Sequence, residues 1–217
     1  MEISYIAHSC FKIKGKDITI VIDPYDPKAT GQKIPKLSAD VLLMSHQHDD
    51  HNFKEAVSDY RLLVDTAGEF EVQDVFIHGI KCYHDNKMGE ERGQNVMFLI
   101  EIDGLTVLHL GDLGHELGKE MLEQIPDVDV LLIPVGGVYT IDASTATKVI
   151  SEIEPGIVVP MHYQTPTLTA LPEKLAEVGK FLDEMGVEAN GTVERLKLNK
   201  KSDIPEDTEV IVIAPQN

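Results

Sequence analysis

Three histidines and one aspartate lie within six residues of the chain: His46, His48, Asp50 and His51, in the order HxHxDH. In extended backbone the side chains of His46 and His48 point to the same side, so one metal ion can bind both. Asp50 and His51 are adjacent, project in different directions and can serve a second ion. This spacing predicts a site for two metal ions, and the alternative is a solvated polar loop.

The types of ligand also restrict the metal. Imidazole and carboxylate groups favour zinc, iron, manganese or nickel, and no thiolate lies within residues 46–51 to favour a softer metal. We therefore expect two divalent ions, with zinc as the first choice and manganese, nickel or iron as alternatives.

The motif must be positioned by the elements around it. An apolar run at 41–44 predicts a buried strand that leads directly into His46. Further strands are expected at 2–6, 10–14, 18–22, 62–65, 75–78, 80–84, 96–102, 105–110, 130–133, 157–159 and 209–213. Helices are expected at 54–60, 118–124, 144–153 and 171–185, the third of them capped by Asp142. This mixture predicts an α/β or α+β sandwich, and with no linker in the sequence we expect a single domain over residues 1–217.

The motif resembles the signature of the metallo-β-lactamase superfamily, which His46, His48, Asp50 and His51 match without a substitution. Other landmarks of that superfamily follow in order, namely His84 in CYHD, Gly111-Asp112 in HLGD and His162 in PMHY. The resemblance covers residues 1 to about 165 and implies the four-layer αββα sandwich of that fold. The segments AHSCF at 7–11, IDP at 22–24 and PMHY most resemble the branch that contains ascorbate-6-phosphate lactonase and other small metal-dependent hydrolases.

The resemblance also implies the role of each ligand. The set is His46, His48 and His84 for one ion, Asp50, His51 and His162 for the other, and Asp112 as a bridge between them. Two cations lower the pKa of a shared water and polarise an ester or phosphoryl oxygen. Asp50 is expected to orient the resulting hydroxide and to help move its proton.

Some assignments have alternatives. His78, six residues before His84, also follows an apolar strand; we favour His84 because it precedes the glycine-rich segment 89–93. The related branch has a histidine facing the site at the position of His8. It can bind a substrate oxygen, donate a proton or make only a structural hydrogen bond. Asp23 can orient a ligand imidazole or simply form an Asp-Pro turn.

Five more polar residues have structural explanations as their first interpretation. His115 follows Asp112 closely and can approach the pocket, but it and His109 are more often structural. Cys82 is expected to pack in the interior. Arg92 and Asn95 can fix a loop or touch an anionic group, and neither is assigned a catalytic role.

The charge balance bears on the substrate. The chain has 37 acidic and 19 basic residues, a formal net charge of -18, which repels long polyanions and disfavours a nucleic-acid groove. Two divalent ions would add about four positive charges at the site, so a small anionic substrate is compatible with this charge.

The composition also bears on location. No apolar run reaches the roughly 20 residues that cross a bilayer, and two cysteines, Cys10 and Cys82, are too few for a disulfide framework. We expect a cytoplasmic protein that does not bind membranes, and a homo-oligomer is compatible with the sequence.

These observations favour a hydrolase that acts on a small ester-type substrate. By resemblance, the favoured substrates are phosphodiesters and phosphorylated lactones. The alternatives are a nuclease acting on short RNA or DNA, an oxidoreductase-like protein without flavin, and a metal-binding protein without catalysis. The fold alone does not make the chain a β-lactamase.

Overall fold

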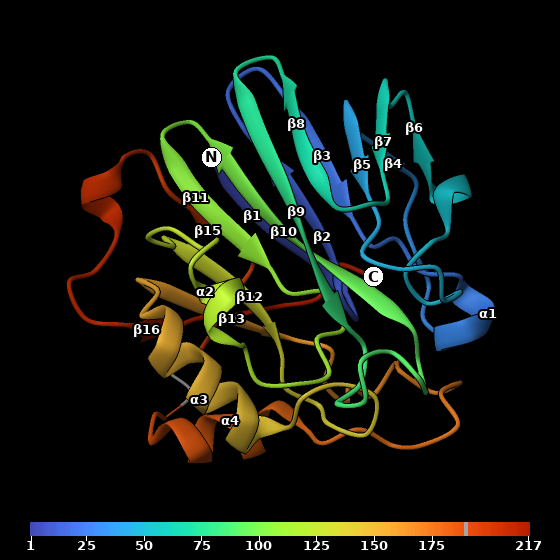
Figure 1. Ribbon diagram of the computed structural model, residues 1–217. Coiled ribbons are helices and arrows are strands. Elements are labelled where there is room, and N and C mark those ends of the chain that lie inside the picture. Colours follow the sequence, from blue (N-terminus) through green and yellow to red (C-terminus); the bar gives the residue numbers. More distant parts are fainter. Residues whose placement is uncertain (189–190) are drawn as a thin grey trace.

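Two β-sheets lie face to face in the computed structural model, which describes residues 1–188 and 191–217 (Figure 1). The first sheet has the strand order β15-β1-β2-β3-β5-β7. Its strands are β1 (Glu2–Ala7), β2 (Cys10–Lys14), β3 (Thr19–Ile22), β5 (Val41–Leu43), β7 (Leu62–Val64) and β15 (Leu196–Lys197). The antiparallel meander β1-β2-β3 is continued by the parallel strands β5 and β7.

The second sheet has the order β16-β13-β12-β11-β10-β9-β8. Its strands are β8 (Gly68–Val72), β9 (Val75–Tyr83), β10 (Gln94–Ile102), β11 (Leu105–His109), β12 (Val130–Pro134), β13 (Ile157–Met161) and β16 (Glu209–Val210). Pairing is antiparallel from β8 to β11 and parallel from β11 to β16. Two small parallel pairs complete the strands, β4 (Leu37–Ser38) with β6 (Val57–Ser58) and β14 (Thr192–Val193) with β17 (Val212–Ile213).

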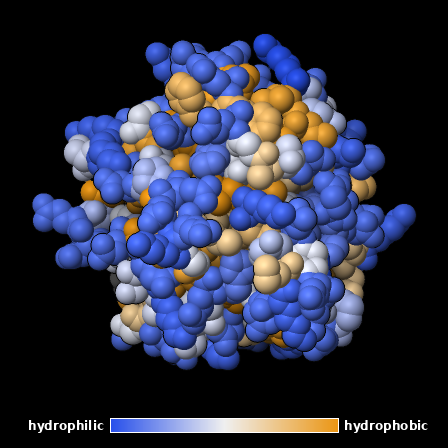
Figure 2. Space-filling view, viewed as in Figure 1, coloured by the Kyte–Doolittle hydropathy of each residue, from blue (hydrophilic) through white to orange (hydrophobic). Residues whose placement is uncertain are grey.

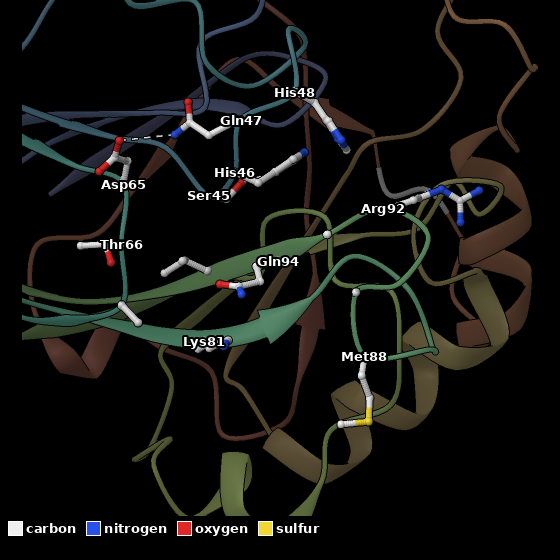
Figure 3. A pocket seen from close by; sticks show the side chains of 14 residues that line it. Ser45, His46, Gln47, His48, Asp65, Thr66, Lys81, Met88, Arg92 and Gln94 are labelled. Atoms are coloured by element: carbon white, nitrogen blue, oxygen red, sulfur yellow. Dashed lines mark hydrogen bonds between the residues drawn. The ribbon is translucent and has the colours of Figure 1, made fainter.

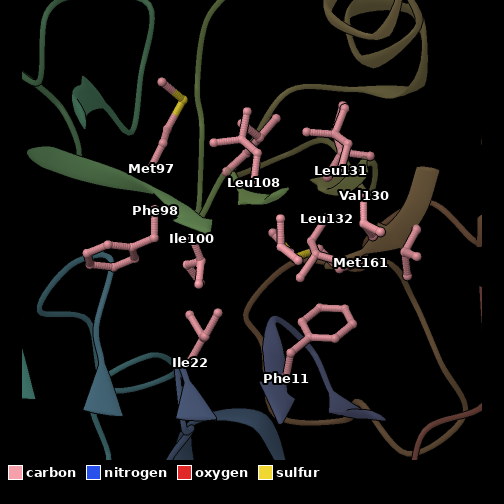
Figure 4. Close-up of a cluster of buried hydrophobic side chains, with 14 of the residues drawn as sticks. Phe11, Ile22, Met97, Phe98, Ile100, Leu108, Val130, Leu131, Leu132 and Met161 are labelled. Carbon is pink, nitrogen blue, oxygen red and sulfur yellow. The ribbon is translucent and has the colours of Figure 1, made fainter. Parts of the chain in front are cut away.

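The main hydrophobic core lies between the two large sheets because their strands alternate inward and outward side chains. Figure 4 shows this packing, in which the facing residues are Phe98, Ile100 and Leu132 of the second sheet and Phe11 and Ile22 of the first. All five side chains are fully buried.

Helices cover the second sheet near β12 and β13, where α3 (Ala143–Ile153) packs against α4 (Val178–Met185) (Figure 1). As the sequence predicts, Asp142 caps α3, and its carboxylate accepts a hydrogen bond from the Thr145 backbone N–H at 2.9 Å. The buried face of α3 includes Ala146 and Val149.

The outer face of the first sheet has a much thinner cover. Val21 and Leu42 point outward and pack in a second cluster with Leu37 of β4 and Ala56 of the 3-10 helix η1 (Lys54–Ala56). The four-residue helix α1 (Pro27–Thr30) also belongs to this half of the chain. The fold is therefore the expected metallo-β-lactamase sandwich, with short segments in the fourth layer. The remaining helical segments are α2 (Lys119–Leu122) and η2 (Lys201–Asp203).

Several expected elements differ in the structure. The two strands expected at 75–78 and 80–84 form the single strand β9. The helix expected at 54–60 is wrong, because η1 is followed by β6, whose backbone pairs with β4. The helix expected at 171–185 is present only as α4, from Val178 onward. The strand expected at 209–213 divides, since β16 pairs with β13 whereas β17 pairs with β14.

The face in Figure 2 is mostly hydrophilic, in agreement with the net charge of -18. None of the helices in the described part of the chain has the length and apolar character needed to cross a bilayer.

Candidate metal centre

The polar residues of the candidate site all follow the C-terminal ends of strands. They come from six different strands: His8 after β1, Asp23 after β3, His46 after β5, His84 after β9, Asp112 after β11 and His162 after β13. Rigid strands thus bring residues far apart in sequence to one place, while the loops provide the polar side chains.

Several of these residues have backbone angles that are unusual for side chains with a Cβ atom. His8, Asp23 and His162 have φ values of 57°, 49° and 51°, in the left-handed region. Such conformations cost energy and persist only where the surrounding structure holds them. Here the backbone N–H of His162 donates to the carbonyl of His8 at 2.8 Å, and the Tyr5 hydroxyl donates to the same carbonyl at 2.8 Å. The left-handed turns aim these side chains at the centre.

Three histidines form the first group of candidate ligands. Each of His46, His48 and His84 offers a nitrogen, and these three atoms lie within 4.8 Å of one another. His46 and His84 are buried, whereas His48 is exposed. This is the group that the sequence resemblance assigns to one ion. The alternative, His78, lies elsewhere on β9, where it lines a separate cavity with Phe76.

A second group combines Asp50, His51 and His162 with His8, again with one ligand atom each within 4.8 Å. His8 Nε2 lies 3.1 Å from Asp50 Oδ2. Burial and the neighbouring His162 lower the pKa of His8 to about 4, so this imidazole is neutral near pH 7. Of the three roles considered for His8, the structure shows the hydrogen bond, which links its imidazole to the carboxylate of Asp50.

Asp112 lies between the two groups. Its Oδ2 is 3.2 Å from both His84 Nε2 and His162 Nε2, and its Oδ1 is 3.3 Å from His51 Nε2. Burial alone would raise the pKa of Asp112, but His162, His51 and His84 more than offset this and hold the pKa well below its usual value. The carboxylate is therefore ionised and in contact with members of both groups.

Asn95 and Gly111 hold Asp112 in this place. The Asp112 backbone N–H donates to Asn95 Oδ1 at 3.0 Å, and the Asn95 amide donates to the carbonyl of Leu110 at 2.9 Å. Gly111 has a φ of 55°, and a Cβ there would collide with Asn95 and with Ser45, the latter at 2.6 Å. Asn95 thus fixes the loop that carries Asp112, one of the two roles considered for it from the sequence.

Asp23 links two of the histidines through their Nδ1 atoms, one directly and one through Ser45. Its Oδ2 accepts a hydrogen bond from the Ser45 hydroxyl at 2.6 Å and lies 3.0 Å from His51 Nδ1. The Ser45 hydroxyl in turn lies 2.9 Å from His46 Nδ1. Burial raises the pKa of Asp23, but the hydrogen bond and charge of His51 outweigh it and lower the pKa below its usual value. Of its two sequence interpretations, the structure supports the orienting role.

This network determines which nitrogen of each ring is free. An ionised carboxylate only accepts hydrogen bonds, so His51 must carry its hydrogen on Nδ1. The single hydroxyl hydrogen of Ser45 is donated to Asp23, so His46 must also donate from Nδ1. A neutral His46 therefore has its lone pair on Nε2. Burial lowers the pKa of His51, but Asp112, Asp50 and Asp23 outweigh it and raise the pKa well above its usual value. Loss of this proton on metal binding would leave the His51 lone pair on Nε2 as well. Ser45 was not singled out from the sequence, because only the fold shows what its hydroxyl touches.

Buried polar atoms without a hydrogen-bond partner indicate whether the site suits a metal ion. His46 Nε2, His51 Nε2 and Asp112 Oδ1 are buried and have no hydrogen-bond partner among the described residues. The same three residues form a third group whose ligand atoms lie within 4.8 Å of one another. Buried polar atoms without a partner are costly, and two imidazoles that have lost the proton on Nε2 are, with a carboxylate, good ligands for a divalent ion. The residues present thus fit a metal centre.

Two other histidines near the site have structural partners. His109 lies under the site, with its Nε2 3.0 Å from the carbonyl of Ser9 and its Nδ1 accepting from the Gly111 N–H at 3.0 Å. His115 Nε2 accepts from the Tyr83 N–H at 3.2 Å. Both agree with the structural interpretation.

Two cavities open beside the centre. A cavity of about 630 Å³ is lined by His46 and His48 and, as Figure 3 shows, by Lys81, Gln94 and Thr66 on the opposite side. The second, of about 290 Å³, has polar and apolar walls. Its lining consists of His48, Asp50, His84, Asp112 and Arg92 together with Ala29, Tyr139, Leu171 and Pro172.

This fold and site agree with the comparisons to known proteins. The model of the beta-lactamase superfamily domain matches residues 2–162, and the chain belongs to this superfamily. A Thermotoga maritima protein, described as a zinc-dependent hydrolase of the metallo-β-lactamase superfamily, has 33% sequence identity and a TM-score of 0.76. The match covers 98% of this chain and 97% of that one.

Curated relatives carry a related name. A UPF0173 metal-dependent hydrolase of Carboxydothermus hydrogenoformans is 28% identical, with 85% of this chain and 92% of the relative covered. A UPF0173 metal-dependent hydrolase of Nanoarchaeum equitans is 29% identical, with 94% of this chain and 99% of the relative covered. Neither of these two names specifies a substrate.

Proposed function

We propose that the protein is a dinuclear metal-dependent hydrolase that acts on a small ester-type substrate. The observation that carries this proposal is the overlap of the three ligand groups. His46 belongs to the first and third groups, and His51 to the second and third. Asp112, in the third group, contacts His84 of the first group and His162 of the second. Two ion positions that share one carboxylate account for this overlap.

In this proposal His46, His48 and His84 hold one ion and Asp50, His51 and His162 the other, with Asp112 between them. Zinc is our first choice because it prefers imidazole and carboxylate ligands; manganese, nickel and iron bind the same groups. When bound, two such ions lower the pKa of a water molecule and polarise the ester or phosphoryl oxygen.

Residues of the chain orient the attacking water and accept its proton. Asp50 can orient the attacking water and accept its proton. His8 Nε2, 3.1 Å from Asp50 Oδ2, donates a hydrogen bond to this carboxylate and holds it in position. Asp23 and Ser45 keep the histidine lone pairs directed at the centre.

Phosphodiesters and phosphorylated lactones are the substrate classes we propose. The cavities of about 630 Å³ and 290 Å³ have volumes near or within the range of small-molecule sites. The net charge of -18 argues against long nucleic acids as partners.

The test is a comparison of hydrolysis rates for a chromogenic phosphodiester and a chromogenic lactone, using purified protein with its metal content measured. We expect turnover of at least one, lost on chelation and restored by zinc or manganese. Asp112→Asn, which is nearly isosteric, should lower kcat by more than about 100-fold. His78→Ala, a histidine outside the centre, serves as the control. If protein with two bound ions hydrolysed neither ester, the proposed hydrolase activity would be wrong.

A further inference from the structure

Arg92 forms part of the wall of both cavities beside the metal centre. Among the described residues, His48 is the one other that lines both. In the part of the chain that the structure describes, Arg92 is the sole lysine or arginine that lines the smaller cavity, whose wall also includes Asp50 and Asp112. A cation at this position is notable in a chain with a net charge of -18 and only three arginines.

The loop that carries Arg92 is organised around the buried carboxylate of Asp85. This carboxylate accepts four backbone hydrogen bonds, including one from the Arg92 N–H at 2.8 Å and one from the Gly89 N–H at 2.9 Å. Asp85 follows His84 directly, so the loop is fixed to a candidate ligand.

The Arg92 side chain is held from the opposite side of the cavity. Its Nη2 donates to the carbonyl of Val138 at 3.2 Å, and the guanidinium lies 5.7 Å from the centre of the Tyr139 ring. The Tyr139 hydroxyl accepts from the Glu173 N–H at 3.0 Å. Three loops therefore meet at Arg92, which restricts the side chain before any ligand binds.

The backbone of Val138 is strained. It has a φ of 65°, a strained conformation for a β-branched residue, and its carbonyl is the one that accepts from Arg92. Strained backbone of this kind is concentrated at binding and catalytic sites. Within the described residues this is the single hydrogen bond of the Arg92 guanidinium, and its Nη1 also lies 4.0 Å from Glu91 Oε2 in a looser ion pair. A guanidinium has five N–H donors in a planar fork, so donors remain for a ligand.

We propose that Arg92 binds an anionic group of the substrate, a phosphate or a carboxylate, beside the metal centre. A guanidinium presents paired donors that match the oxygens of either group, which an ammonium cannot do in the same geometry. This inference rests on the proposed function, and it makes Arg92 a residue that determines specificity for charged over neutral esters.

The test measures the dissociation constant of inorganic phosphate for the metal-loaded protein by calorimetry, with acetate as a second ligand. Arg92→Met should weaken binding of the recognised anion by about 10- to 100-fold, as expected for loss of a hydrogen bond between charged groups. Arg92→Lys should lie between Arg92→Met and the unchanged protein. Arg195→Met, on the exposed arginine that pairs with Glu2, is the matched control and should stay within about twofold. The anion that loses more affinity identifies the group as phosphate or carboxylate.

A purely structural role for Arg92 would affect all ligands alike. Arg92→Met should therefore raise KM for an anionic ester while leaving KM for a matched neutral ester unchanged. Equal changes for the two esters, phosphate and acetate affinities within about twofold of the unchanged protein, or binding of neither anion would overturn the inference. If no ester is hydrolysed but anion binding still depends on Arg92, the proposed function fails and this inference stands.

Discussion

Asp23 Oδ2 lies 3.0 Å from His51 Nδ1, and both side chains are completely buried. The carboxylate fixes the hydrogen of the imidazole on Nδ1 and directs Nε2 toward Asp112, 3.3 Å away. A hydrogen bond to the far nitrogen of a metal-binding histidine both orients the ring and makes it a stronger ligand. The position of Asp23 therefore has a direct consequence for metal affinity.

Asp23→Asn should weaken metal binding by about 10- to 100-fold. Both oxygens of Asp23 accept hydrogen bonds, Oδ1 from the Ser45 N–H and Oδ2 from His51 and the Ser45 hydroxyl. In asparagine one of these oxygens is replaced by an NH2 group, which is itself a donor. It would face another donor, so at least one of these hydrogen bonds would be lost. Competition with a chelating dye measures the change. Asp129→Asn alters a buried aspartate outside the centre and should leave metal affinity unchanged; an equal loss in both variants would contradict the role of Asp23.

Gly111→Ala should destabilise the protein by about 2 kcal/mol or more, because it combines a left-handed backbone with a collision against Ser45. Urea unfolding followed by circular dichroism measures the free energy of unfolding. Gly179 lies in α4, where a Cβ would meet no atom within 4 Å. Gly179→Ala should be neutral or stabilising by up to about 1 kcal/mol. A Gly111→Ala protein as stable as the unchanged one would refute this account of the loop.

Asp142→Ala should cost about 1 kcal/mol of stability at pH 7, the usual effect of losing an N-cap. Hydrogen bonds from Thr145 lower the pKa of Asp142 in the folded protein. A lowered folded-state pKa contributes stability that is complete above the unfolded pKa of about 3.9 and is lost as pH falls through the folded pKa. The difference between the two proteins should therefore shrink below about pH 4. Asp142→Asn retains a cap without the charge, and its stability should not show this contribution to the pH dependence.

Much of the candidate site could be predicted because its residues are local to recognisable patterns. The ligand set expected from the sequence lies within the three groups, and His84 is there instead of His78. The environments of Asp23 and Ser45 could not be predicted in the same way. Their partners, His51 and His46, depend on how β3 and β5 pair, and the residue types alone allow a simple turn at Asp23.

The errors in secondary structure also have physical causes. Residues 171–177 have a helical apolar pattern, yet their backbone N–H groups are used elsewhere. The Leu175 N–H donates to the Gln164 side chain at 3.2 Å, and the Ala176 N–H donates to the Gly136 carbonyl at 2.9 Å. These tertiary contacts bind the segment to the loops beside the metal centre and compete with helix formation.

Two metal ions should bind in the groups around Asp112, and metal stoichiometry tests this most directly. The protein should be purified without chelators and analysed by mass spectrometry for zinc, manganese, iron and nickel. We predict about two divalent ions per chain, about one or fewer in a His46→Ala, Asp112→Ala double variant, and no change in His78→Ala. Purified, folded protein that contains no metal and takes up none from zinc- or manganese-containing buffer would contradict the account.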